Sequence, residues 1–183
     1  MGPFLYMMLL GCRPAGRLTE QHDIFFGIGN SMKDLIPVIK NFWPEAKGII
    51  HVDAWRKVSQ VGNYKIEVIE KTQRDLNQPQ LFFINLGGYK PGEFDEFHYK
   101  MLIVSSNKSE AIQHSKQKAF YKHVGFKGAE SHIDDKYGVD VDEILEIKDI
   151  LSSELKTKYQ FKIFENGGIE DEMNLGYFKL DKL

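Results

Sequence analysis

The chain has 183 residues, of which 42% are hydrophobic and 27% are charged, and its formal net charge is −2. This composition is ordinary for a globular protein with its own core, and it excludes a strongly basic nucleic-acid surface or an anionic-membrane patch. The single cysteine, Cys12, excludes an intramolecular disulfide and a cysteine-rich zinc site, and it fits a cytoplasmic location.

The first predicted element is a buried strand at Leu5–Leu10, which ends in Gly11. The run MGPFLYMMLLGC has the Leu-Leu-Gly-Cys ending of a lipoprotein signal, but no Lys or Arg precedes its short apolar part. A similar run, LFFINLGG at residues 81–88, lies deep inside the chain, where no targeting signal can act. We therefore predict a strand, and no run reaches the roughly 18 apolar residues of a membrane span.

The next elements follow in a regular order. A loop with Pro and Gly, CRPAGRLTE, precedes a strand at His22–Ile28. Ser31 is a suitable N-cap for a helix through MKDLIPVIKNFW, in which Pro37 is tolerated only near the helix start. GIIHVDAW and NYKIEVIEK are then predicted as the third and fourth strands.

The second half of the chain repeats this order. With an offset of 76 residues, the window 5–40 aligns with 81–116 without a gap, and eight pairs are identical. HVD at 51–53 aligns with HID at 132–134 after an insertion, and IEV at 66–68 with LEI at 145–147. Tandem duplication explains this agreement. The identical pairs are Leu5/Leu81, Leu10/Leu86, Gly11/Gly87, Gly16/Gly92, Glu20/Glu96, His22/His98, Ile36/Ile112 and Lys40/Lys116.

The predicted fold is α+β, with two divergent β-β-α-β-β repeats at residues 1–76 and 77–155 that pack as one compact body. We expect mixed sheets with helices on one face, in which the second and third strands of each repeat run parallel. The second helix is expected at Ser109–Lys122, a strand at SHID, and a strand or helix at EILEIKDIL. Residues 156–183 are predicted to form a β-hairpin that covers a sheet edge.

GCRPAGRLTEQHDIFFGIGNSMKDLIP followed by FWPEAKGIIHVDAW resembles a small bacterial family known as domain of unknown function 1543. The resemblance is closest over residues 5–58 and weaker over 81–150, and the predicted hairpin lies outside it. That family's unit occurs in one or two copies, which agrees with the duplication predicted for this chain. It implies no activity, cofactor or catalytic residue.

The repeated polar positions are the candidate site. Residues two apart on a strand share a face, so Glu20 with His22, and His51 with Asp53, form two carboxylate–imidazole pairs. Such pairs anchor loops, build a ligand pocket, or bind zinc, manganese or non-haem iron. His22, His51 and Asp53 are weak metal candidates because the spacing matches no compact metal motif. The corresponding positions in the second repeat are Glu96, His98, His132 and Asp134.

Three further residues complete the candidate pocket. Arg13 and Arg17 lie in the first loop, where they suit an anion or remain solvated. Trp55 follows the His-x-Asp pair and either roofs a pocket, packs on the core or lies in a subunit contact. The stretch GIGNS lacks the full dinucleotide fingerprint, so no cofactor is expected.

Three functions remain open. The first is a ligand-binding or interaction protein without catalysis, whose partner is an unknown small molecule or protein. The second is a small hydrolase or isomerase that uses a His–carboxylate site, with or without a metal. The third is a structural homodimer. Neither a nucleic acid nor a membrane is expected as a partner.

Overall fold

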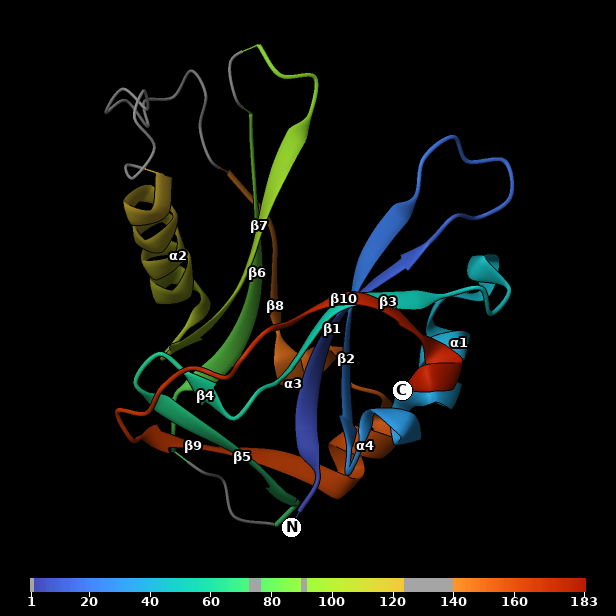
Figure 1. Ribbon diagram of the computed structural model, residues 1–183. Helices are drawn as coiled ribbons and strands as arrows, with labels where there is room; N and C mark the ends of the chain where they lie inside the picture. The colour runs from blue at the N-terminus through green and yellow to red at the C-terminus, as the bar shows by residue number, and fades with distance from the viewer. Residues whose placement is uncertain (1, 73–76, 90–91, 124–139) are drawn as a thin grey trace. The chain divides into compact units, whose positions relative to one another are not determined.

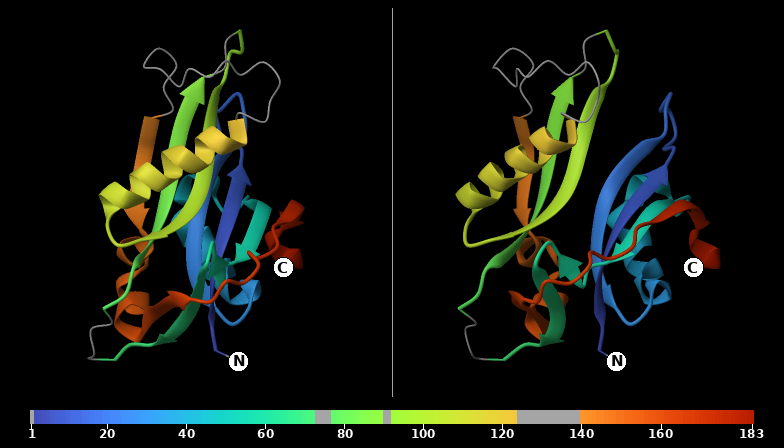
Figure 2. Two further views of the ribbon diagram at one scale, coloured as in Figure 1. Left: turned by 90° about the vertical axis from the view of Figure 1, so that its left-hand side faces the viewer. Right: turned by 60° about the vertical axis from the view of Figure 1, so that its left-hand side comes forward.

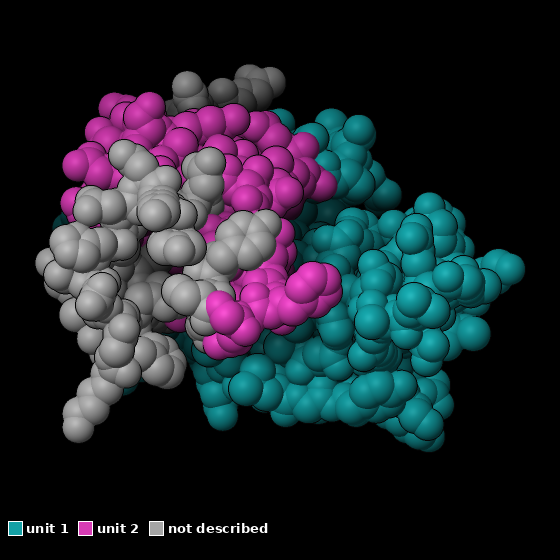
Figure 3. Space-filling view, turned by 90° about the horizontal axis from the view of Figure 1, so that it is seen from above, with its two compact units in different colours: residues 1–76, 151–183 teal, residues 77–150 magenta. Residues whose placement is uncertain are grey.

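The computed structural model describes residues 2–72, 77–89, 92–123 and 140–183 (Figure 1). The chain forms two compact units, which are coloured separately in Figure 3. Unit 1 consists of Met1–Leu76 and Leu151–Leu183, and unit 2 of Asn77–Ile150. Unit 1 is therefore discontinuous in sequence, because the whole of unit 2 is inserted between its two segments.

A four-stranded sheet forms the larger part of unit 1. Its strands are β1 (Phe4–Cys12), β2 (Gln21–Gly29), β3 (His51–Lys57) and β10 (Asn174–Lys179), in the order β10-β3-β1-β2. β1 pairs antiparallel with β2 on one side and with β3 on the other. β2 and β3 thus run in the same direction without being neighbours.

One face of this sheet is covered by the helical connection from β2 to β3. This connection contains η1 (Met32–Leu35), α1 (Ile36–Phe42) and η2 (Pro44–Ala46), and Pro37 is tolerated because it lies in the first turn of α1. The Asp34 carboxylate accepts hydrogen bonds from the backbone N–H groups of Asn30 and Ser31, both at 3.0 Å. The core beneath contains Tyr6, Met8, Leu10, Cys12, Phe25, Leu35, Ile39, Ala46, Ile50, Val52 and Leu180.

The second sheet of unit 1 has three strands. β5 (Tyr64–Glu70) pairs antiparallel with the short β4 (Gln60–Val61) and with β9 (Tyr159–Glu165). β9 follows α4 (Ser153–Lys158), and the chain ends in η3 (Leu180–Lys182). The predicted fourth strand is therefore real, but it belongs to a separate sheet.

Unit 2 is built on an antiparallel sheet of three strands. These are β6 (Gln80–Tyr89), β7 (Glu96–Ser105) and β8 (Asp140–Glu146), in the order β7-β6-β8. α2 (Lys108–His123) lies across one face of the sheet (Figure 2), where Ala111 joins Phe82, Ile84 and Ile103 in the core. The short helix α3 (Ile147–Ile150) follows β8 directly. α2 confirms the predicted second helix within one residue at each end.

Three predictions of topology are wrong. The described sheets are antiparallel rather than mixed: β2 and β3 run in the same direction as predicted, but β1 lies between them, and in unit 2 β6 lies between β7 and β8. β9 and β10 do not form a hairpin: β9 pairs with β5 in one sheet, and β10 covers the edge of β3 in the other. The IEV and LEI matches also differ in structure, because IEV lies in β5 whereas LEI spans the end of β8 and the first residue of α3.

The predicted SHID strand lies outside the described residues. The third strand of the unit 2 sheet is β8, part of which was expected to be a fourth strand or a helix. In each unit the described sheet with its covering helix has the element order β-β-α-β.

Candidate functional site

Gly11 lies in register between the two predicted histidines. It is paired with His22 across β1–β2 and with His51 across β1–β3. Residues directly opposite one another in an antiparallel pair project from the same face, so both imidazoles stand on the face that Gly11 would occupy with a side chain. A Cβ built at Gly11 would lie against His51 Nε2 and 2.5 Å from Asp53 Oδ2. The absence of a side chain at Gly11 therefore allows the two outer strands to share one site over β1.

Four side chains converge there, and we refer to Glu20, His22, His51 and Asp53 as the four-residue cluster. His51 Nε2 lies 3.0 Å from Glu20 Oε1 and 3.2 Å from Asp53 Oδ1. His22 Nε2 lies 3.2 Å from Asp53 Oδ2 and 3.8 Å from Glu20 Oε2. Each imidazole thus contacts both carboxylates, and each carboxylate contacts both imidazoles.

The cluster has a buried base and an exposed mouth. The His51 side chain is 8% exposed and that of Asp53 is 26% exposed, whereas His22 and Glu20 are 43% and 45% exposed. His51 Nε2 and Asp53 Oδ2 are buried atoms that have no hydrogen-bond partner among the described residues, despite their short contacts. A buried polar atom without a hydrogen bond costs stability, so it calls for a partner such as an ion.

The donor atoms of the cluster are of the kinds that bind a metal ion. Ligand atoms bound tetrahedrally at about 2.1 Å from zinc are separated by roughly 3.4 Å. Four N···O distances of the cluster, 3.0 to 3.8 Å, bracket this value. The ligand atoms of the cluster do not all lie within 4.8 Å of one another, however, so its side chains would have to close around a tetrahedral ion. Two imidazoles and two carboxylates are also a donor set that zinc, manganese and non-haem iron accept. A divalent cation would offset the repulsion between the two carboxylates.

A β-bulge in β3 explains why Asp53 joins the cluster and Trp55 does not. The register with β1 shifts between Leu10↔Val52 and Leu9↔Ala54, which leaves Asp53 as the extra residue. Without the bulge, Trp55 would share the face of His51. With it, Trp55 pairs with Met8 and packs against the core beside Tyr6, where its Nε1 is buried.

The C-terminal strand adds an aromatic ring that the sequence did not indicate. Tyr177 stacks on His51 with ring centroids 4.2 Å apart and an interplanar angle of 29°. It reaches this position because β10 has an irregularity against β3 between Leu175 and Phe178, where Gly176 adopts φ 153°. Tyr177 lies outside the repeat, so the internal comparison that selected the other residues could not find it.

Arg13 and Arg17 remain apart from these contacts. Both are exposed in the loop between β1 and β2, where Arg13 Nε donates to the backbone oxygen of Arg17 at 3.3 Å. The Arg17 N–H in turn donates to Pro14 O at 3.2 Å. These bonds shape the loop, and the structure gives no contact between either guanidinium and the four-residue cluster.

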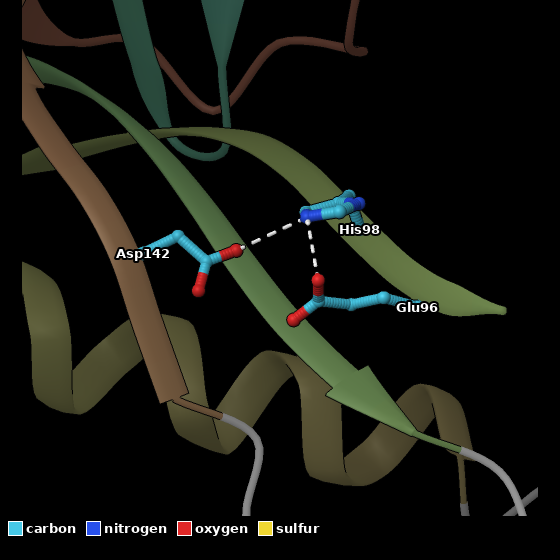
Figure 4. Close-up of side chains that lie close together, drawn as sticks. All are labelled: Glu96, His98 and Asp142. Carbon is cyan, nitrogen blue, oxygen red and sulfur yellow. Dashed lines mark ion pairs between the residues drawn. The ribbon is translucent and has the colours of Figure 1, made fainter.

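Unit 2 carries a related cluster of three residues, Glu96, His98 and Asp142 (Figure 4). His98 Nε2 lies 3.3 Å from Asp142 Oδ2 and 3.9 Å from Glu96 Oε2. One ligand atom from each residue lies within 4.8 Å of the other two. We refer to this group as the three-residue cluster.

The three-residue cluster has the same register as its counterpart in unit 1. Gly87 pairs with His98 on one side and with Asp140 on the other, and the register shift falls between Asn85 and Leu86. A Cβ at Gly87 would lie 2.5 Å from Asp142 Oδ2. Asp142 is therefore the bulge residue of β8, and by register it corresponds to Asp53.

The register of β8 assigns other residues to the third strand than the sequence alignment did. His132 and Asp134, the predicted counterparts of His51 and Asp53, lie outside the described residues. The corresponding register positions belong to Asp140 and Asp142, because the connection between the helix and the third strand is longer in unit 2. The motif DVD at 140–142 was the signal for this pairing.

Comparison with known proteins supports the fold and assigns one region. Residues 17–68 match the model of the family described as Domain of Unknown Function (DUF1543). Residues 17–68 are a DUF1543 domain. The DUF1543 domain contains all four residues of the four-residue cluster, whereas Gly11 and Tyr177 lie outside it. No curated protein matches the chain by sequence.

A solved structure extends the likeness beyond the DUF1543 domain. The crystal structure of a protein Il1583 from Idiomarina loihiensis matches with a TM-score of 0.66 and 19% sequence identity. The match covers 97% of this chain and 98% of that chain. At this identity the likeness shows a shared fold alone and carries no information about function. Among the described residues, no helix is both long and apolar enough to cross a membrane.

Proposed function

We propose that the protein binds a divalent transition-metal ion in the four-residue cluster, with Glu20, His22, His51 and Asp53 as ligands. The observation that carries this proposal is the buried His51 Nε2, which has two carboxylate oxygens at 3.0 and 3.2 Å and no hydrogen-bond partner among the described residues. A hydrogen-bonded anchor would satisfy that atom. A metal ion satisfies the nitrogen and both carboxylates together.

Metal binding can be tested with the full chain after removal of metal by a chelator. Equilibrium dialysis against Zn²⁺ should show a bound ion that depends on the cluster. Loss of a second-shell partner commonly weakens metal affinity about 10- to 100-fold, so His51→Ala and Asp53→Asn should each exceed that loss. The matched control is His114→Ala, which removes an exposed histidine of α2 and should leave Zn²⁺ bound.

The contrary outcome is also clear. If His51→Ala and Asp53→Asn lower the melting temperature but leave Zn²⁺ binding at the wild-type level, the cluster is a structural anchor. If the wild-type chain binds no Zn²⁺, Mn²⁺ or Fe²⁺ at this cluster, the proposal fails. Circular dichroism of each variant shows whether the fold is retained.

A second candidate is metal-assisted hydrolysis, and the exposed mouth of the cluster favours it. An ion held by all four ligands would need a fifth coordination position for water, and the exposed Glu20 and His22 place that position on the solvent side. A bound divalent cation supplies Lewis acidity at that position. Turnover of p-nitrophenyl esters or phosphodiesters by the Zn²⁺-loaded protein, lost in His51→Ala, would support it. Metal binding without turnover would leave a binding protein.

We also infer that the two units arose by duplication of a β-β-α-β element. The orders β3-β1-β2 and β8-β6-β7 support this, as does the glycine of each central strand opposite a histidine. The bulge in the same place of the third strand is the strongest support, because an irregularity of register is harder to reach independently than a hairpin. Superposition of the two units in an experimental structure tests the inference, and divergent backbones around Gly11 and Gly87 would refute it.

A further inference from the structure

We propose that the three-residue cluster of unit 2 is a second divalent-cation site, and that it discriminates less against harder cations such as Mn²⁺ than the site of unit 1 does. The inference rests on the proposed metal site of unit 1. It goes beyond that proposal by assigning a separate site and a different selectivity to unit 2.

Geometry provides the first support. Glu96 and His98 are two residues apart on β7 and share a face, while Asp142 approaches from β8 across the central strand. Figure 4 shows the Glu96 and Asp142 carboxylates approaching the same imidazole nitrogen of His98. Neighbouring ligands of an octahedral ion at about 2.2 Å lie roughly 3.1 Å apart and opposite ones about 4.4 Å apart. The distances of 3.3 and 3.9 Å fall within this range.

The surroundings of Asp142 provide the second support. Gly87 leaves the space that the Asp142 carboxylate occupies, as Gly11 does for Asp53. Asn85, two residues before Gly87 on β6, donates from Nδ2 to Glu143 Oε2 at 2.8 Å and to Asp142 Oδ2 at 3.4 Å. The Oδ1 atom of Asn85 is buried without a hydrogen-bond partner among the described residues. Asp142 therefore has an orienting partner of the kind that supports metal-ligating carboxylates.

The donor set decides the selectivity. The register position of His51 in unit 1 is held by Asp140 in unit 2, so the repeated pattern retains one histidine instead of two. With one imidazole instead of two beside two carboxylates, the donor set is richer in oxygen, which reduces the advantage of zinc over oxygen-preferring cations. The side chains of Glu96, His98 and Asp142 are 41%, 36% and 28% exposed, and none is as buried as His51. The site in unit 2 should therefore bind more weakly than the site in unit 1.

Competitive metal loading of the full chain tests this assignment. The metal-free protein is dialysed against Zn²⁺ with Mn²⁺ in large excess, and both metals are counted by mass spectrometry. We expect one Zn²⁺ and one Mn²⁺ per chain. His98→Ala and Asp142→Asn should each lower Mn²⁺ affinity at least tenfold and leave Zn²⁺ bound, whereas His51→Ala should do the reverse. His114→Ala, the matched histidine control on α2, should change neither.

The outcomes separate the two proposals. If Zn²⁺ binds as expected but Mn²⁺ does not, the second site is refuted and the first stands. The same holds if Mn²⁺ binding survives both His98→Ala and Asp142→Asn. If Mn²⁺ binds and is lost in those variants while Zn²⁺ never binds, the second site stands and the first fails. If neither metal binds, both fail. Asp142→Asn preserves the shape of the side chain, so a loss of binding in that variant cannot be ascribed to a cavity.

Discussion

His22 and His51 face the same residue of β1 from opposite sides, and they contact the same two carboxylates. Their strands are separated by β1, so the contact depends on the one position of β1 that has no side chain. This relationship makes Gly11 as important to the site as any of the four polar residues, although it contributes no ligand atom.

The first prediction concerns that position. Gly11→Ala should abolish Zn²⁺ binding, because the new methyl group would displace His51 and Asp53 while leaving all four ligands in the sequence. Gly2→Ala is the matched control, since its nearest neighbour would be the Val68 oxygen at 3.9 Å. Zinc titration of both variants by calorimetry provides the comparison. Unchanged affinity in Gly11→Ala would show that the cluster does not act as a unit.

The second prediction concerns Tyr177. An aromatic contact contributes about 0.5–1.5 kcal/mol, so Tyr177→Ala should weaken Zn²⁺ affinity about 2- to 10-fold by freeing the His51 ring. Tyr177→Phe keeps the stacked ring and should bind as the wild type does. An equal loss in both variants would instead assign the effect to the phenolic hydroxyl.

The third prediction concerns Cys12, which lies in β1 on the core side of the sheet. Burial raises the pKa of its thiol above the ordinary value of 9.0, and the Glu20 and Glu45 carboxylates raise it further. As pH rises, the thiol therefore ionises at a lower pH in the unfolded chain than in the folded chain. The free energy of unfolding should therefore decrease above about pH 9, and it should decrease more in the wild type than in Cys12→Ala.

Urea unfolding of both proteins at pH 8 and pH 10 measures this difference. Equal losses of stability would contradict the prediction. Native Cys12 should also react with a thiol reagent on the order of 100-fold more slowly than the urea-unfolded chain does, because the thiolate forms only on opening.

The fourth prediction concerns Asp171, which fixes the segment before β10. Its carboxylate accepts hydrogen bonds from Ser59 N at 2.7 Å, Ser59 Oγ at 2.5 Å and Gln60 N at 2.8 Å. Asp171→Ala should lower the free energy of unfolding by about 2 kcal/mol, since it leaves two partly buried N–H groups without an acceptor. Glu172→Ala, at an exposed neighbour, should change stability by less than about 0.5 kcal/mol. Chemical denaturation of both variants measures the difference.

Local patterns in the sequence predicted most of the elements. The apolar runs correspond to β1, β2, β3 and β6, and the N-cap at Ser31 corresponds to the start of η1, which leads into α1. These features depend on neighbours in the chain, so they are visible in a single sequence. The pairing of β9 with β5 and of β10 with β3 is not, because apolar alternation does not specify which distant strand is the partner.

The candidate site was predicted only in part, for a related reason. The face of Glu20, His22 and His51 follows from regular alternation along their strands. Asp53 and Trp55 are separated by a bulge, and the sequence contains no sign of the extra residue that sends Trp55 to the core. The alignment of HVD with HID was chosen because the residue types match. The strand register instead pairs Gly87 with Asp140, so the alignment did not identify Asp142.

The insertion of unit 2 within unit 1 has a consequence for biosynthesis. A ribosome that has made β1, β2 and β3 must synthesise all of Asn77–Ile150 before β9 and β10 emerge. During that time β3 and β5 present open edges, while the strands of the inserted unit are made in one continuous segment. We expect nascent chains stalled before residue 159 to require chaperone protection, and the ring that covers His51 to arrive only as translation ends.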